Sequence, residues 1–244
     1  MSAQPPVTAP GEHFRVWPPE RTWRLARIIM QSWAAPMMRL KVYGQDRIPR
    51  AGGAVIAANH IAGDDPLVLG FSSPRSIRFM AKSELWTYPV LRRVMPHTGA
   101  FPVRRGEADR EAIALGRDVL RSGNLLGVFV EGTRQSSGAI GAAHTGAAML
   151  AVMGGSPVIP ACIHGTDHHK RNPFHRATIA YGTPIDVSRA GRGAKAYKAI
   201  AAAIEEELRG LQEFIIAAEK AGRPDDAVPP VSRPFVEDPR DQEA

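Results

Sequence analysis

Three short, unbroken apolar runs constrain the fold more than any other feature of the sequence. Residues 54–58 read AVIAA, residues 125–130 read LLGVFV and residues 157–163 read PVIPACI. Each run has the length of a strand and lacks polar alternation, which is typical of strands covered on both faces. In the third run, Pro160 marks either an edge strand or a bulge.

Helical patterns separate these runs, most clearly over residues 107–122, where apolar residues recur at helical spacing. Strands that alternate with helices predict an α/β fold with a mixed, largely parallel central sheet and helices on both faces. Further elements are expected as strands over 40–43, 77–80, 99–103 and 177–181, and as helices over 84–95 (broken at Pro89), 145–153 and 194–221.

The chain of 244 residues is long enough for one domain with appendages. Residues 1–20 are rich in proline and are expected to form a disordered N-terminal segment. The alternating pattern occupies residues 44–221. From Gly222 onward proline and aspartate dominate, which predicts a disordered tail over residues 222–244.

Residues 21–43 combine flanking arginines with tryptophans and methionines and are expected to form an amphipathic helical segment that Pro36 kinks or divides. This composition suits a helix lying in a bilayer interface. It equally suits a helix that packs on the core of its own domain. The sequence favours neither alternative over the other.

The net charge of +7 and the pI of about 10.0 indicate an anionic partner: a nucleic acid, an anionic bilayer or a phosphorylated substrate. No motif that reads RNA or DNA is recognisable, so we expect no nucleic-acid partner. The single cysteine, Cys162, excludes a disulfide framework. We expect neither a secretory signal nor a membrane-spanning helix, since the first ten residues are polar and no run of 18 apolar residues occurs.

Chemistry first becomes visible where the run at 54–58 ends. Asn59 and His60 follow it directly, and Asp65 and Pro66 come after a glycine turn. Aspartate is a preferred N-cap and proline a preferred first helical residue, which predicts a helix that begins at Pro66 and is capped by Asp65. The Asp65 carboxylate can also accept the Nδ1 proton of His60, which leaves Nε2 as a base. Taken alone, such a pair is more often a turn histidine and an N-cap.

Two later stretches place polar groups directly after strands. Arg104 and Arg105 follow the strand expected over 99–103, and the arginine side chain forks onto phosphate oxygens. Residues 129–134 read FVEGTR, in which a buried strand ends in a carboxylate, a glycine, a hydroxyl and a guanidinium. Glu131 could there orient Arg134 or a substrate hydroxyl. The alternatives are a solvated loop for the first stretch and a chance turn for the second.

A histidine-rich patch follows the third apolar run. The spacing of His164 and His168 would suit a metal on a helix, but Gly165 and Asp167 indicate a loop. We favour a polar surface loop and expect no metal site. The patch comprises His164, Asp167, His168, His169 and His175.

Four motifs in order resemble the glycerophospholipid acyltransferase family, and within it the bacterial 1-acyl-sn-glycerol-3-phosphate (lysophosphatidic acid) acyltransferases. They are Asn-His-x4-Asp-Pro at 59–66, Gly-Ala-Phe-Pro-Val-x-Arg at 99–105, Phe-x-Glu-Gly-Thr-Arg at 129–134 and Ile-Pro at 159–160. The likeness covers about residues 40–185 and assigns an acyltransferase domain to residues 44–221. It implies that the N-terminal segment is a membrane-docking element.

The resemblance implies roles for individual residues. His60 is the general base, and Asp65 orients it. Arg105 binds the phosphate of the acceptor, and acceptor binding also falls to Glu131, Gly132, Thr133 and Arg134. Arg104, Val130 and Gln135 depart from the family's usual acidic residue, proline and serine, respectively. No acyl-enzyme is required, which agrees with the absence of a G-x-S-x-G serine motif.

The implied function is transfer of a fatty acyl group from acyl-CoA or acyl carrier protein to the free hydroxyl of lysophosphatidic acid, which gives phosphatidic acid. The donor is a substrate, and no cofactor is expected. The alternatives are glycerol 3-phosphate, another lysophospholipid or a glycolipid as acceptor, or a non-catalytic module that binds anionic membranes. The expected partners are an anionic membrane surface, the acyl donor and the lysophospholipid acceptor. The expected location is the cytoplasmic face of the cell membrane, as a peripheral or monotopic protein.

Overall fold

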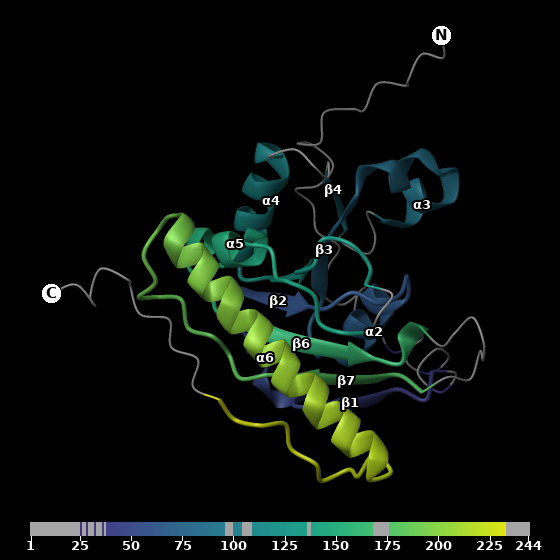
Figure 1. Cartoon of the computed structure of the whole chain (residues 1–244). Helices are drawn as coiled ribbons and strands as arrows, with labels where there is room; N and C mark the ends of the chain where they lie inside the picture. Colours follow the sequence, from purple (N-terminus) through teal and green to yellow (C-terminus); the bar gives the residue numbers. More distant parts are fainter. Residues whose placement is uncertain are drawn as a thin grey trace, which may run out of the picture.

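The structure is a computed structural model that describes residues 25, 28, 32, 36, 38–95, 100–103, 109–135, 138–167 and 176–232. Within these residues seven strands form one sheet in the order β1-β7-β6-β2-β5-β3-β4 (Figure 1). The strands are β1 Lys41–Tyr43, β2 Ala54–Ala58, β3 Ile77–Lys82, β4 Phe101–Val103, β5 Leu125–Phe129, β6 Val158–His164 and β7 Thr178–Tyr181. All neighbouring pairs are parallel except β6 and β7, so the predicted mixed, largely parallel sheet is confirmed.

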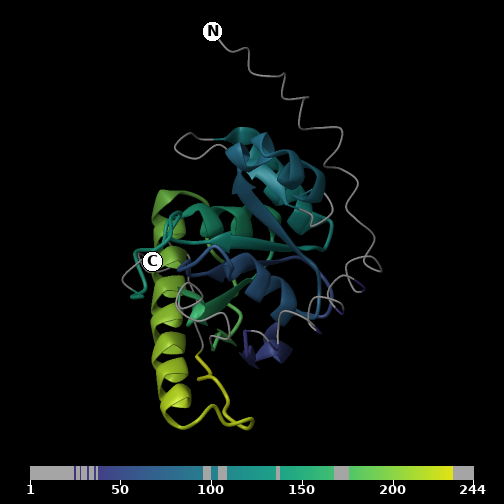
Figure 2. The same cartoon turned by 90° about the vertical axis from the view of Figure 1, so that its right-hand side faces the viewer.

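Helices cover both faces of this sheet, as the sequence predicted. Helices α4, α5 and α6 contribute to one apolar cluster, and α2 contributes to the other. In Figure 2, α6 runs along one side of the sheet. The helices are α2 Asp65–Ser72, α3 Pro89–Val94, α4 Arg110–Arg121, α5 Gly146–Gly154 and α6 Ala194–Lys220, with short 3-10 helices η1 Gln45–Arg47 and η2 Ser83–Thr87.

Strand β2 lies at the centre of both clusters. Val55 and Ala57 point into the cluster with α4, α5 and α6, whereas Ala54, Ile56 and Ala58 point into the cluster with α2. All five side chains are fully buried. A continuous apolar run is therefore needed here, because each face of the strand packs against helices.

Local signals explain several element ends. Asp109 caps α4 by accepting a hydrogen bond of 3.0 Å from the backbone N–H of Ala112. Helix η2 ends at Thr87, and Pro89 begins α3, in agreement with the expected break. Gly155 ends α5 in the left-handed region, with φ of 62°.

Pro160 lies inside the sheet, since β6 pairs with β7 on one side and with β2 on the other. Ala161 pairs with Tyr181, whereas Val158, three residues earlier, pairs with Ile185, four residues later. Between these two pairs, two residues of β6 (159–160) lie opposite three residues (182–184) of the segment after β7, which forms a bulge. At a bulge the sheet does not need the N–H that proline lacks. Of the two alternatives for Pro160, the structure shows the bulge.

The segment after α6 departs from the expected loose tail over residues 222–232. It contains no helix or strand, but hydrogen bonds tie it to the start of the domain. The Arg47 guanidinium donates to the carbonyl oxygens of Pro229 and Pro230 at 2.6 and 3.0 Å, and the Tyr43 hydroxyl donates to that of Pro224 at 3.1 Å. Residues 233–244 lie outside the described residues, as does the segment 1–20.

Of the expected helical segment 21–43, the structure describes residues 38–43, where Met38 is buried in the core and Lys41–Tyr43 form β1 instead of helix. It also describes Leu25, Ile28, Ser32 and Pro36, all of which are helical and exposed. Their spacing of three or four residues places them on one face of the helix. The Ser32 hydroxyl donates to the Ile28 carbonyl at 2.9 Å. Among the described residues, no helix combines the length and the apolar character needed to cross a bilayer.

Candidate active site

The carboxyl ends of four neighbouring parallel strands meet at one edge of the sheet. Strand β2 leads into Asn59 and His60, and its neighbour β5 leads into Val130 and Glu131, because Ala58 is paired with Phe129. Strands β3 and β4 end together, with Lys82 opposite Val103. Ligand sites of α/β proteins lie at such edges, and the strand order places the ends of β2, β5 and β4 along this one.

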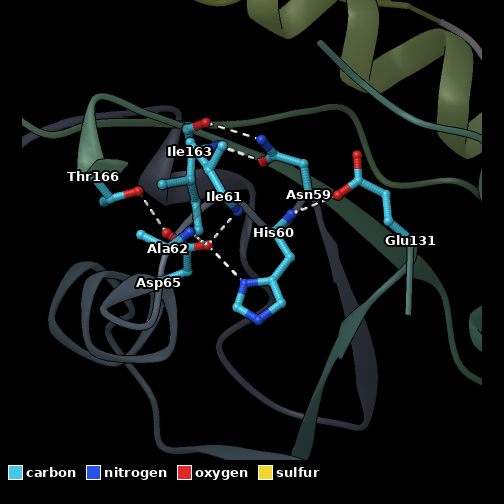
Figure 3. Close-up of polar contacts among 8 residues, drawn as sticks. All are labelled: Asn59, His60, Ile61, Ala62, Asp65, Glu131, Ile163 and Thr166. Atoms are coloured by element: carbon cyan, nitrogen blue, oxygen red, sulfur yellow. Dashed lines mark hydrogen bonds and ion pairs between the residues drawn. The ribbon is translucent and has the colours of Figure 1, made fainter. Parts of the chain in front are cut away.

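His60 and Asp65 form a buried pair at this edge (Figure 3). The Nδ1 atom of His60 lies 2.7 Å from Oδ2 of Asp65, and the residues are 7% and 0% exposed. The same oxygen accepts hydrogen bonds from the backbone N–H groups of Ile61 and Ala62 at 2.6 and 2.8 Å. An ionised carboxylate accepts hydrogen bonds only, so Nδ1 carries the ring proton and donates it to Oδ2, which leaves Nε2 as the basic nitrogen.

The prediction that Asp65 caps a helix beginning at Pro66 is wrong. Helix α2 begins at Asp65 itself, and Asp64 occupies the N-cap position. The reason is that the Asp65 carboxylate turns back toward residues 60–62 and binds their donors instead of the N–H groups of its own helix. Pro66 then occupies the second helical position, where its missing N–H is still harmless.

The imidazole of His60 also packs against Phe129, the last residue of β5. The ring centroids are 4.1 Å apart and the planes are inclined by 20°. Phe129 is backed in turn by Phe79 at 6.5 Å. The ring is therefore fixed on its face by stacking and at Nδ1 by hydrogen bonding, with Nε2 left for chemistry.

Glu131 is buried, with 4% exposure, and both of its carboxylate oxygens accept backbone N–H groups. Oε2 accepts from His60 and Oε1 from Gly141, each at 2.8 Å. Figure 3 shows the first of these bonds. The sequence suggested that Glu131 orients Arg134 or a substrate hydroxyl. It did not indicate that Glu131 binds the backbone N–H groups of His60 and Gly141.

The other residues of the FVEGTR turn lie around the same point. Gly132 adopts φ of 68°, and a Cβ there would lie 3.2 Å from the His144 ring, so glycine suits both the backbone and the space. Thr133 and Arg134 are exposed. The backbone N–H of Gln135 donates to the carbonyl of His60 at 2.8 Å. The turn therefore holds both backbone polar groups of His60.

Comparison with known proteins shows which family this chain belongs to. A family model described as Acyltransferase matches residues 39–164, more than half of the chain. The chain belongs to the acyltransferase family. The likeness stated from the motifs is thereby confirmed.

Individual relatives agree with the family model. The 1-acyl-sn-glycerol-3-phosphate acyltransferase of Bacillus subtilis is 30% identical over 155 residues, which are 58% of this chain and 77% of that protein. The Streptococcus pneumoniae protein of the same name is 31% identical over 150 residues, covering 60% of this chain and 55% of that protein. The crystal structure of the 1-acyl-sn-glycerophosphate (LPA) acyltransferase PlsC from Thermotoga maritima matches with a TM-score of 0.64 at 23% identity, covering 83% of this chain and 85% of that one. At this identity, the last match shows the fold alone.

Arg105, which is expected to bind phosphate, and its neighbour Arg104 lie outside the described residues. The structure does place the strand that precedes them, since Val103 ends β4 beside Lys82. The assignment of Arg105 to the phosphate of an acceptor stays a prediction.

Of the histidine-rich patch, the structure describes residues up to Asp167. His164 is the last residue of β6 and is half-buried, whereas Thr166 is buried completely. His168, His169 and His175 lie outside the described residues. In the part of the chain that the structure describes, no three histidine, cysteine or acidic side chains gather as metal ligands would.

Cys162 is buried within β6, in the acyltransferase core. Burial raises the pKa of its thiol, and the neighbouring Glu131 adds to this shift. A thiol kept protonated is a poor nucleophile. We therefore do not expect Cys162 to act as a nucleophile.

Proposed function

We propose that this acyltransferase moves a fatty acyl group from acyl-CoA or acyl carrier protein to the free hydroxyl of lysophosphatidic acid, giving phosphatidic acid. The observation that carries the chemistry is the buried 2.7 Å contact between His60 and Asp65 at the carboxyl edge of parallel strands. The names of the Bacillus and Streptococcus relatives support the choice of acceptor.

In the proposed mechanism, Nε2 of His60 removes the proton from the acceptor hydroxyl as its oxygen attacks the thioester carbonyl of the donor. Asp65 stabilises the imidazolium that forms. The carbon–sulfur bond then breaks, and the imidazolium protonates the leaving thiolate. General-base assistance typically contributes about 10²–10⁴-fold, and orientation of the two bound substrates contributes much of the rest.

The acceptor headgroup lies, in this proposal, between the FVEGTR turn and the end of β4. Arg105 binds the phosphate, and Gly132, Thr133 and Arg134 complete the acceptor site. The exposed side chains of Thr133 and Arg134 stay available for a ligand beside the held backbone of His60. Guanidinium groups suit a phosphate because they present paired donors and keep their charge.

We also propose that the enzyme works at an anionic membrane surface, on the cytoplasmic face, as a peripheral or monotopic protein. The net charge of +7 favours such a surface. Exposed apolar side chains occur both on the N-terminal helical segment and around α3, where Arg92 and Arg93 are also exposed. Exposed aromatic and aliphatic side chains beside arginines are typical of interfacial helices. The apolar residues are Leu25, Ile28, Tyr88 and Val90.

An acyl-transfer assay with lysophosphatidic acid and acyl-CoA or acyl carrier protein tests the mechanism. His60→Ala and Asp65→Asn are each expected to lose most of the turnover while remaining folded by circular dichroism. Wild-type turnover in either variant would contradict the base assignment. The acceptor is tested with a panel that contains glycerol 3-phosphate, other lysophospholipids and a glycolipid. A clear preference for one of these over lysophosphatidic acid would make that compound the acceptor instead.

A further inference from the structure

Thr166 lies outside every motif quoted above, yet it touches the centre of the site. Its side chain is fully buried, and its hydroxyl donates to Oδ1 of Asp65 at 2.6 Å (Figure 3). We propose that Thr166 is a positioning residue that orients His60 through Asp65. This inference rests on the proposed general-base role of His60.

The two oxygens of Asp65 have different partners. Oδ2 accepts from Nδ1 of His60 and from the backbone N–H groups of Ile61 and Ala62, whereas Oδ1 accepts the Thr166 hydroxyl. A carboxylate bound on one side only can turn about its Cβ–Cγ bond, and terminal torsions of this kind are broad. The bond from Thr166 holds the second oxygen, so it fixes the carboxylate plane and the direction of the bond to the imidazole.

The fold supplies Thr166 by a defined route. Strand β6 runs beside β2, and the Asn59 side chain binds the backbone of Ile163 with bonds of 2.7 and 3.0 Å, which joins the two strand ends. The chain then turns at Gly165, whose φ is 83° and where a Cβ would overlap the carbonyl oxygen of Arg176. Only glycine fits there, and the turn brings Thr166 to the start of α2, where Asp65 lies.

The test compares Thr166→Val, which keeps the shape and removes the hydroxyl, with Thr166→Ser, which keeps the hydroxyl. Hydrogen bonds to charged groups are among the stronger ones in proteins, so we expect kcat to fall roughly 10-fold in the valine variant. KM for lysophosphatidic acid and for the donor should stay at the wild-type value, because Thr166 is fully buried behind Asp65. The serine variant should retain wild-type kcat.

Three results would overturn the proposal: wild-type kcat in Thr166→Val, an equal loss in Thr166→Ser, or a loss carried by KM alone. If the valine variant does not fold, Thr166→Ala is compared with Thr166→Ser, since both lack the methyl group and only serine has the hydroxyl. Equal kcat in these two would also overturn it. His60→Ala, assayed in parallel, separates the two proposals. If His60→Ala keeps its turnover, the base assignment fails. If His60→Ala loses its turnover while Thr166→Val keeps wild-type kcat, only the role of Thr166 is refuted.

Discussion

Replacing Glu131 by glutamine tests whether this residue holds the backbone of His60 in place or binds the acceptor. Its two carboxylate oxygens each accept one backbone N–H, from His60 and from Gly141. Glutamine offers one oxygen and one NH2 group, so it can accept only one of the two bonds. Its NH2 group then faces the other N–H, donor against donor, at a site with 4% exposure.

The magnitude follows from these contacts. A hydrogen bond to a charged group contributes about 1.5–3 kcal/mol, and a buried donor left unpaired costs a similar amount. We therefore expect Glu131→Gln to lower the free energy of unfolding by about 2–3 kcal/mol. Because one of the two N–H groups belongs to His60, a shift of the imidazole is also expected, and a misplacement of about 1 Å can cost up to about 10²-fold in rate.

The assay combines urea unfolding with steady-state kinetics in which the acceptor is varied. The backbone-holding role predicts lower stability and lower kcat, with KM for the acceptor unchanged. Glu213→Gln, on an exposed position of α6, is the matched control and should change none of these quantities. If Glu131→Gln instead raises KM at wild-type stability and kcat, Glu131 binds the acceptor and the reasoning from its hydrogen bonds is refuted.

Two further predictions concern the substrate and the membrane. Arg105→Ala should mainly raise KM for lysophosphatidic acid at nearly constant kcat; an unchanged KM removes Arg105 from the phosphate site. Val90→Glu in α3 should weaken binding to vesicles that contain anionic lipid, measured by co-sedimentation, because it places a negative charge at an exposed apolar position that would face the negative lipid headgroups. Val228→Glu is its control, because Val228 is 73% exposed and Val90 72% exposed; equal loss of binding in both variants would contradict a docking role for α3.

Much of the fold could be predicted because its signals are local. The apolar runs became β2, β5 and β6, and the expected contact between His60 and Asp65 is present, since five residues around a strand-to-helix turn suffice to form it. The start of α2 was missed by one residue. Its position depends on which donors the Asp65 carboxylate binds, and these lie in the preceding loop.

The supporting contacts could not be predicted from local patterns. Glu131 lies 71 residues from His60, and Thr166 lies 101 residues from Asp65. Each pair meets only because β5 and β6 both flank β2. Apolar runs alone indicate that such strands exist, but not which of them are neighbours. Thr166 stood in a histidine-rich stretch, and its composition drew attention to metal binding rather than to a single hydroxyl.

The strand order itself explains why the imidazole is held from two sides. Strand β2 is parallel to both of its neighbours, so the loops that follow β5 and β6 leave the sheet on either side of the loop that follows β2. From the β5 side, Glu131 binds the backbone of His60; from the β6 side, Thr166 binds the carboxylate that orients the ring. Neither residue touches the other's target. The two supports should therefore act independently, so the losses of kcat in Glu131→Gln and Thr166→Val should multiply in the double variant, and a double variant no slower than the worse single one would show that they form a single unit.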